Sequence, residues 1–202
     1  MPKAATTLAR NGWVYQIKVT LLDSQPAIWR RLLVPADITL EKLHRVLQVA
    51  MGWDDQHLHH FIVGKVFYES PLPFDNGFVD SEAGDAVTAR LCDVLPRVKA
   101  KMVYEYDFGD SWLHNIEVEK IVEPPVEGQV PSCLAGANAC PPEDCGGPPG
   151  YMDMLEALRD SNHPEHEAMS EWIGGEFDPA HFDIAVVNRR LKPKGRRATA
   201  KA

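Results

Sequence analysis

The chain of 202 residues is 45% hydrophobic and 25% charged, which is typical of one compact globular domain and excludes collagen, coiled coil and intrinsic disorder. A chain of this length buries enough apolar surface to fold without disulfides or a metal ion. The sequence has no apolar run long enough to span a bilayer and no secretory signal, so we expect a cytoplasmic protein with reduced cysteines.

The net charge is −8, but the basic side chains are concentrated at the two ends of the chain. Residues 189–202 carry seven basic side chains and no acidic one, and residues 1–12 carry two more, which leaves −17 for residues 13–188. A body this acidic repels phosphate backbones, so any DNA binding would be weak and confined to the tail. We expect a flexible N-terminus over residues 1–12 and a disordered basic tail over residues 192–202.

The first part of the chain predicts a hairpin followed by a helix. Residues 13–22 alternate between apolar and polar side chains, and residues 27–34 follow after a cluster of turn-forming residues. Over residues 39–51, apolar side chains recur at three- and four-residue spacing until Gly52 ends the pattern. This region therefore predicts two antiparallel strands and one amphipathic helix, with His44 on the flank of the apolar stripe.

The remainder of the chain predicts further strands and then helices. Residues 58–68, 101–106 and 112–122 have strand character, and their short separations favour antiparallel pairing. Residues 123–150 are rich in Pro and Gly, so we expect an irregular loop. Helical patterns follow over residues 151–159, 164–173 and 179–191. The sequence thus predicts one α+β domain over residues 13–191, with a mostly antiparallel sheet of about five strands, one helix inserted after the first hairpin, and a C-terminal group of about three helices.

Three of the four cysteines, Cys133, Cys140 and Cys145, fall in the expected loop. Thiolates bind zinc, and an irregular loop can fold around a tetrahedral ion. A fourth ligand would come from elsewhere, and His114 is the nearest suitable donor in the sequence. The spacing matches neither a zinc ribbon nor a zinc finger, and free thiols that pack the loop onto the sheet are the alternative interpretation.

The turn between the last two predicted strands carries two aspartates, and a histidine follows it. If the turn brings Asp107, Asp110 and His114 together, they would bind a divalent cation or act as acid and base on a substrate. Aspartates are also common in turns because their side chains accept hydrogen bonds from turn amides. A purely structural role therefore stays open for these residues.

A third set of residues offers imidazoles and carboxylates. His57 and His59 share one face of the predicted third strand and would chelate an ion as a pair, whereas His60 points away. Glu143 and Asp144 stand between two of the cysteines and would join a cation site or cap the helix that follows. A functional site on this chain requires the cysteine-bearing segment and the aspartate-bearing turn to meet in space.

Five ordered stretches of the sequence resemble the plasmid pRiA4b ORF-3-like family. They are YQIKVTLLDSQPAIWRRLL (residues 15–33), LHRVLQVAMGWDDQHLHHF (43–61), YEYDFGDSWLHNI (104–116), residues 133–151 with CPPEDCGG, and residues 163–191 with HPEHEAM, FDPAHFD and VNRRL. The resemblance implies an α+β domain carried on mobile or accessory DNA, in a family whose members are often called transposon passenger proteins of TnpR type. A serine recombinase needs a basic DNA-reading domain, and this chain shows no helix-turn-helix signal.

Several catalytic signatures are missing, namely G-x-G-x-x-G, G-x-x-x-x-G-K-[ST], G-x-S-x-G and H-E-x-x-H. We therefore expect a non-catalytic binding or adaptor domain with an unidentified protein or small ligand as partner, no membrane contact, and zinc as the one cofactor to consider. The alternative is a metal-dependent hydrolase or nuclease that uses Asp107, Asp110 and His114. A further alternative is weak DNA binding through the basic tail.

Overall fold

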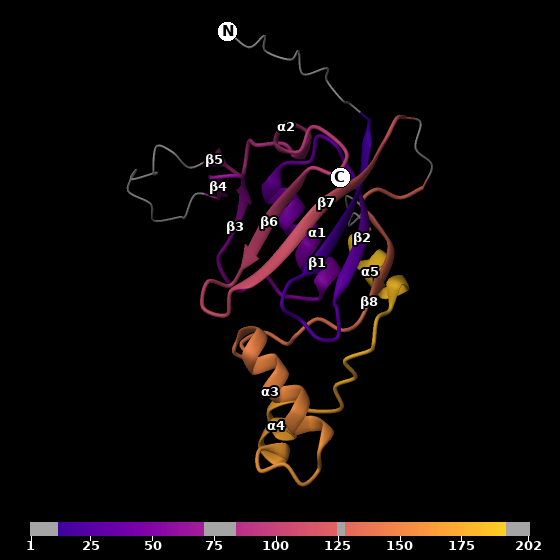
Figure 1. Ribbon diagram of the computed structural model, residues 1–202. Coiled ribbons are helices and arrows are strands. Elements are labelled where there is room, and N and C mark those ends of the chain that lie inside the picture. The colour runs from indigo at the N-terminus through magenta and orange to yellow at the C-terminus, as the bar shows by residue number, and fades with distance from the viewer. Residues whose placement is uncertain (1–11, 71–83, 125–127, 193–202) are drawn as a thin grey trace, which may run out of the picture.

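An eight-stranded mixed sheet crosses the protein, and helix α1 packs against one of its faces (Figure 1). The computed structural model describes residues 12–70, 84–124 and 128–192. The strand order is β5-β4-β3-β6-β7-β1-β2-β8. The strands are β1 (Val14–Leu21), β2 (Trp29–Pro35), β3 (His59–Val63), β4 (Val66–Glu69), β5 (Gly84–Asp85), β6 (Lys101–Tyr106), β7 (Trp112–Val122) and β8 (Ser132–Ala137). The helices are α1 (Leu40–Met51), α2 (Leu91–Val94), α3 (Gly147–Arg159), α4 (His166–Ile173) and α5 (Ile184–Leu191).

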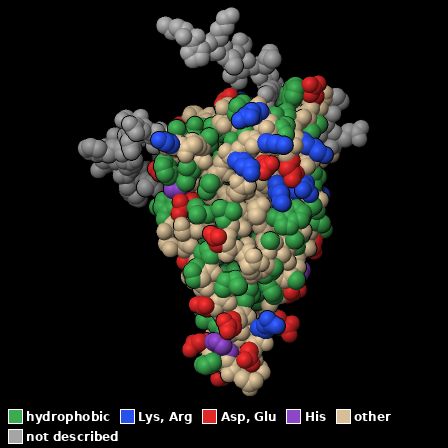
Figure 2. All heavy atoms as spheres, in the orientation of Figure 1, with side chains coloured by type: hydrophobic (Ala, Val, Ile, Leu, Met, Phe, Trp, Pro, Cys, Tyr) green, Lys and Arg blue, Asp and Glu red, His purple; other side chains and the backbone are tan. Residues whose placement is uncertain are grey.

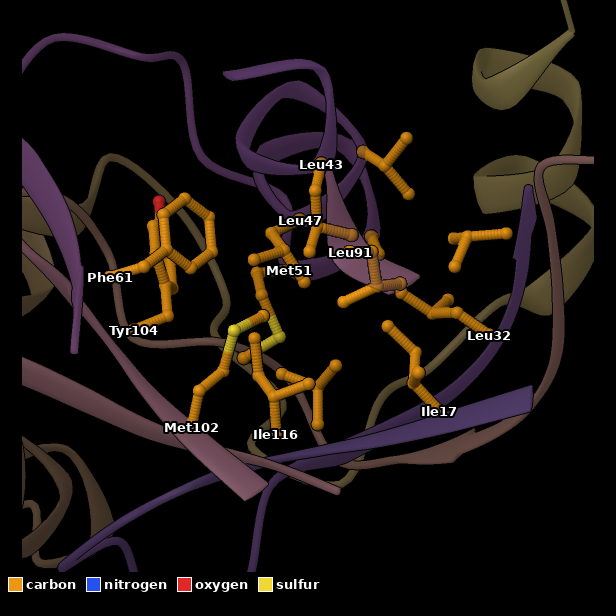
Figure 3. Close-up of a cluster of buried hydrophobic side chains, with 14 of the residues drawn as sticks. Ile17, Leu32, Leu43, Leu47, Met51, Phe61, Leu91, Met102, Tyr104 and Ile116 are labelled. Carbon is orange, nitrogen blue, oxygen red and sulfur yellow. The ribbon is translucent and has the colours of Figure 1, made fainter. Parts of the chain in front are cut away.

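Helix α1 supplies one wall of the hydrophobic core. The hydroxyl of Thr39 caps its first turn by accepting from the amide of Lys42, and Gly52 ends it with a φ of 106°. Leu43 and Leu47 are fully buried, and each stabilises the fold by about 2 kcal/mol. Figure 3 shows that the apolar side of α1 faces side chains from β1, β2, β3, β6 and β7, among them Ile17, Leu32, Phe61, Met102, Tyr104 and Ile116.

The prediction of a five-stranded, mostly antiparallel sheet is wrong. Residues 58–68 form two strands because Gly64, with a φ of 64°, lets the chain reverse so that Val63 pairs with Val66. The two-residue strand β5 then pairs with β4 in parallel, which makes the sheet mixed. An apolar run cannot by itself reveal a reversal of this kind, because both arms of the hairpin keep their strand character.

The segment predicted as an irregular loop over residues 123–150 contains strand β8 and the start of α3. Strand β8 has the sequence SCLAGA, which lacks β-branched residues and apolar alternation, and it pairs antiparallel with β2. It is a strand because the edge of β2 offers unpaired backbone groups, which is a tertiary effect that local propensity does not report.

The three C-terminal helices do not form one group. Helices α3 and α4 pack against each other at the lower end of the view in Figure 1, whereas α5 returns to pack on β8 and α1. The buried side chain of Arg30 holds the segment before α5 against the end of β8. It donates to the carbonyl oxygens of Ala137 and Asn138, and its guanidinium lies 4.2 Å from the ring centroid of Phe182.

Charge is unevenly distributed over the surface. In Figure 2, Lys and Arg side chains gather on the upper part of the visible face, and Asp and Glu side chains gather at the lower end, where Figure 1 places α3 and α4. None of the described helices is long and apolar enough to cross a membrane. The predictions for the N-terminus and the basic tail fall almost entirely on residues 1–11 and 193–202, which lie outside the described residues.

Candidate functional site

The turn between β6 and β7 holds Asp107 in a defined orientation. Its Oδ1 accepts hydrogen bonds from the amides of Gly109 at 2.9 Å and Asp110 at 3.3 Å, and its own amide donates to the carbonyl of Leu58. Asp107 adopts a φ of 59°, which an aspartate tolerates in a tight turn. Because Oδ1 is occupied by the turn amides, Oδ2 is left to face the neighbouring segment.

The segment that carries the cysteines docks onto this turn. The amide of Gly146 donates to Oδ2 of Asp110 at 3.1 Å. A Cβ atom on Gly147 would lie 2.5 Å from the carbonyl oxygen of Asp110, and Gly147 has a φ of 68°, so only glycine fits this contact. The cysteine-bearing segment and the aspartate-bearing turn are therefore in contact.

The loop after α1 also contacts the cysteine-bearing segment. The indole of Trp53 donates to the carbonyl of Pro141 at 3.0 Å, and the amide of Asp54 donates to Oε1 of Glu143 at 3.1 Å. The hydroxyl of Tyr106 donates to the same Glu143 oxygen at 2.9 Å and accepts from the amide of Gln56. Burial raises the pKa of Tyr106, which keeps this hydroxyl protonated as a donor.

His57 lies at the centre of three carboxylates, which together form what we term the His57 group: His57, Asp107, Glu143 and Asp144. Nε2 of His57 is 3.2 Å from Oδ1 of Asp144 and 3.8 Å from Oε2 of Glu143. Nδ1 of His57 is 3.7 Å from Oδ2 of Asp107. Nε2 of His57 and Oε2 of Glu143 are buried and make no hydrogen bond, although buried polar atoms are normally paired.

This donor set suits a divalent cation. One ligand atom each from His57, Asp107 and Asp144 lies within 4.8 Å of the other two. Bonds of 2.0–2.1 Å to a tetrahedral ion place the ligand atoms roughly 3.3 Å apart, close to the separation of His57 Nε2 and Asp144 Oδ1. Imidazole combined with carboxylates suits Zn²⁺ or Mn²⁺.

His114 and Asp110, predicted to act with Asp107, lie outside the His57 group. His114 is fully buried in the sheet, where its Nδ1 is 3.2 Å from the carbonyl oxygen of Tyr104 and its ring meets Trp53 edge-on. Burial lowers the pKa of His114 to about 4, so its imidazole is neutral at pH 7. Asp110 instead anchors the docked segment through Gly146.

The predicted thiolate ligands are not members of the His57 group, although Cys145 directly follows Asp144 in the chain. Cys133 lies on β8, and its thiol donates to the carbonyl of Ala135 at 3.4 Å. Burial raises the pKa of the thiols of Cys140 and Cys145, that of Cys145 to about 12. Within the described ranges, neither of the two groups of three ligand atoms contains a cysteine.

His57 and His59, predicted to bind an ion as a pair, have different neighbours in the structure. The ring of His59 stacks on that of His44, with centroids 3.4 Å apart, and Asp55 lies beside them. The apolar spacing predicts His44 on the flank of the helix and does not single out Asp55. Gln48 was the available signal for a buried polar site, because it stands four residues after His44 and puts a second polar side chain on the buried face of α1.

A cavity of about 350 Å³ adjoins the exposed side of Asp144, between the α3 start and α4. Its lining combines carboxylates with apolar side chains, mainly Asp144, Asp153, Glu165, Met154, Met169 and Trp172. This volume falls at the lower end of the range for small-molecule sites.

Comparisons with other proteins agree with the resemblance seen in the motifs. Residues 13–186 match the family described as plasmid pRiA4b ORF-3-like protein. The chain is 38% identical over 184 residues to the uncharacterized protein y4hQ of Sinorhizobium fredii, a match that covers 88% of this chain and 90% of that protein. The crystal structure of a protein of unknown function from Methanosarcina mazei Go1 is 35% identical, covers 86% of this chain and 96% of its own, and superimposes with a TM-score of 0.75.

Proposed function

The chain belongs to the plasmid pRiA4b ORF-3-like family, and from that premise we propose that it is a binding domain organised by a divalent cation in the His57 group. The observation that carries this proposal is a pair of buried ligand atoms that make no hydrogen bond, His57 Nε2 and Glu143 Oε2, 3.8 Å apart. A cation between them would satisfy both atoms.

The cation would stabilise the close approach of three carboxylates, which repel one another without it. Three carboxylates surround one imidazole, and like charges at close range repel one another. The ligands come from three separate segments: the loop after α1, the β6–β7 turn and the segment before α3. A bound cation would offset the repulsion and link these segments, as structural zinc does in other domains.

The cavity beside Asp144 is where we place the ligand of this domain. Asp144 belongs to both the His57 group and the cavity wall, so the cation would set the position of one wall. Trp172, which is 47% exposed, offers an aromatic surface at the same cavity. A ligand that fills the cavity would therefore bind in a cation-dependent way.

Metal titration tests the proposal. Protein stripped with a chelator is titrated with Zn²⁺ and with Mn²⁺ by calorimetry, in the wild type, in His57→Ala and in the control His181→Ala, whose histidine lies outside the group. We expect His57→Ala to weaken binding at this site about 100-fold and the control to bind as the wild type does. Wild-type binding by His57→Ala, or no uptake of either metal by the wild type, would falsify the proposal.

A metal-dependent hydrolase is the second function that a specific observation favours. The side chain of Asp144 is 68% exposed, so a cation in the His57 group would keep a coordination position open to solvent and could activate a water molecule there. The residues for this role are Asp107, Glu143 and Asp144 with His57, in place of Asp110 and His114. Metal-dependent hydrolysis of p-nitrophenyl phosphate that disappears in Asp107→Asn would support it; metal binding without hydrolysis leaves the binding domain as the function.

Three properties implied by the resemblance or by the composition stay predictions: the TnpR-type association with transposons, the cytoplasmic location and the weak DNA contact through the tail. The tail prediction is tested by retention on immobilised DNA at low salt. Deletion of residues 192–202 should abolish retention, and absence of retention by the full-length protein would contradict the prediction.

A further inference from the structure

We propose that the protein holds a second divalent cation, Zn²⁺, between His44, His59 and Asp55, which we term the His44 group. His44 comes from α1, His59 opens β3, and Asp55 lies in the loop that connects them. One ligand atom from each of the three residues lies within 4.8 Å of the other two. This group shares no residue with the His57 group, and the inference does not depend on the proposed function.

The two imidazoles are stacked face to face, with centroids 3.4 Å apart and planes that differ by 2°. A metal ion lies in the plane of each imidazole that binds it, so the ring of His59 must turn out of this stack for both rings to bind one ion. Nε2 of His59 is buried and makes no hydrogen bond, and Nε2 of His44 is 2.7 Å from Oδ1 of Asp55. An ion bound to all three residues would replace the hydrogen bond between His44 and Asp55 and would supply a partner for Nε2 of His59.

A layer of buried polar groups orients the ligands from behind. Nδ1 of His44 is 2.8 Å from the hydroxyl of Tyr104, which also accepts from Nε2 of Gln48 at 3.0 Å. Oε1 of Gln48 in turn accepts from the amide of Asp55 at 2.9 Å. Metal-binding histidines typically use their second ring nitrogen in this way, which fixes the ring and directs the other nitrogen toward the ion.

The donor set and its exposure indicate the kind of ion and site. Two imidazoles and one carboxylate suit Zn²⁺, which takes three protein ligands where a fourth position stays open. His44 is 1% exposed, whereas the side chain of Asp55 is 52% exposed, so the ion has a route from solvent on the carboxylate side.

Zinc stoichiometry tests the inference, with a matched control on the same strand. His60 follows His59 on β3 but points to the other face, where its Nε2 is 2.8 Å from Oε2 of Glu105. The full-length protein is loaded with Zn²⁺, dialysed and analysed for metal content, and Co²⁺ absorption is recorded as a second readout. We expect two equivalents in the wild type and in His60→Ala, and one equivalent in His59→Ala.

Asp55→Asn keeps the inference testable if His59→Ala fails to fold, because this half-exposed carboxylate can be neutralised without creating a cavity. It should lose the same equivalent and the same part of the Co²⁺ absorption. Two equivalents in the wild type and in either folded variant of the His44 group would overturn the inference.

The outcomes also separate this inference from the proposed function. One equivalent in the wild type that is lost in His57→Ala but kept in Asp55→Asn overturns the second site and leaves the proposed function standing. One equivalent that is lost in Asp55→Asn but kept in His57→Ala supports the His44 group and overturns the proposed function. A wild-type protein that takes up no zinc overturns the inference.

Discussion

The His44 group and the His57 group differ in how the chain assembles them. The His44 group comes from residues 44–59, a continuous stretch that runs from α1 into β3. The His57 group needs the β6–β7 turn and the segment at Glu143 and Asp144 to dock against the loop after α1. The first group therefore depends on the packing of one helix, and the second on contacts between segments far apart in the sequence.

The two groups also differ in their surroundings. His44 is almost fully buried, and Tyr104 and Gln48 hold it from behind. Asp144 is exposed and lines a cavity. Support from buried polar groups favours a fixed geometry, whereas exposure favours access by a ligand. The His44 group therefore has the better-supported ligand geometry, whereas the His57 group is the one that adjoins a cavity for a ligand.

The largest expected effect comes from Gly147→Ala, which disturbs the contact between the docked segment and the β6–β7 turn and so affects only one of the two groups. Gly147→Ala places a methyl group 2.5 Å from the carbonyl oxygen of Asp110, so the docked segment must shift. We expect a loss of about 3 kcal/mol in the free energy of unfolding, from steric overlap and the unfavourable φ together. Metal binding at the His57 group should be lost, and the His44 group should be unaffected. Urea denaturation and metal titration measure the two effects.

Gly174→Ala is the control for this substitution. Gly174 ends α4 with a φ of 70°, close to that of Gly147, but no described residue beyond its own helix and its chain neighbours comes within 4 Å of the added methyl. It should cost about 1 kcal/mol and leave metal binding unchanged. Equal losses in the two variants would show that the close contact with Asp110 does not matter.

Tyr104→Phe and Tyr106→Phe should each affect a different group. Removal of the Tyr104 hydroxyl leaves Gln48 Nε2 and His44 Nδ1 without their buried partner, at a cost of about 2 kcal/mol. It should weaken metal binding at the His44 group alone, whereas Tyr106→Phe, which releases Glu143, should weaken binding at the His57 group alone. Titrations with Co²⁺ measure the affinity of each group in both variants. Equal effects of both variants on both groups would contradict the assignment of one tyrosine to each group.

Asp107→Asn should weaken cation binding at the His57 group about 10-fold with little change in stability. The amide keeps an oxygen for the turn hydrogen bonds from Gly109 and Asp110 but loses the negative charge at Oδ2. Asp110→Asn is the matched control, since Asp110 belongs to the same turn and lies outside the group. If calorimetry gave the two variants the same affinity, Asp107 would not be a ligand.

A further expected effect concerns pH and His114, which belongs to neither group. Burial lowers its pKa from 6.5 to about 4 in the folded protein. Between these values the unfolded chain binds a proton that the folded protein does not, so the free energy of unfolding falls as the pH falls through this window. Above pH 6.5 this loss is absent. His114→Gln should make the decline between pH 6.5 and 4 shallower.

Urea denaturation in the presence of a chelator measures this slope at several pH values. His44 and His59 also have pKa values lowered by burial, so part of the decline should remain in His114→Gln. A decline as steep as that of the wild type would show that His114 does not contribute.

Much of the fold followed from local patterns, and its main error has a physical cause. Apolar periodicity and caps predicted α1, and alternation predicted β1, β6 and β7. The turn-forming residues after β1 and the β-branched and aromatic residues that follow them predicted β2. The same reasoning missed β8, because SCLAGA has no strand propensity and is held by its pairing with β2. It also merged β3 with β4, since the reversal rests on one glycine.

The candidate site was also predicted only in part from the sequence. Residue chemistry alone singled out His57, Asp107, Glu143 and Asp144, because imidazoles and carboxylates are the usual ligands of divalent cations. It could not show that His114 and Asp110 lie apart from them, nor that His44 and Asp55 form a second group. Those facts depend on strand register and on which face each side chain occupies.

The sequence by itself determined the membership of a family, the amphipathic helix, most of the central strands and the residue types able to bind a metal. Only the tertiary structure decided which of those residues meet. The reason is that periodicity records the face that a side chain occupies on its own element, whereas a site forms where faces of elements distant in the chain come into contact.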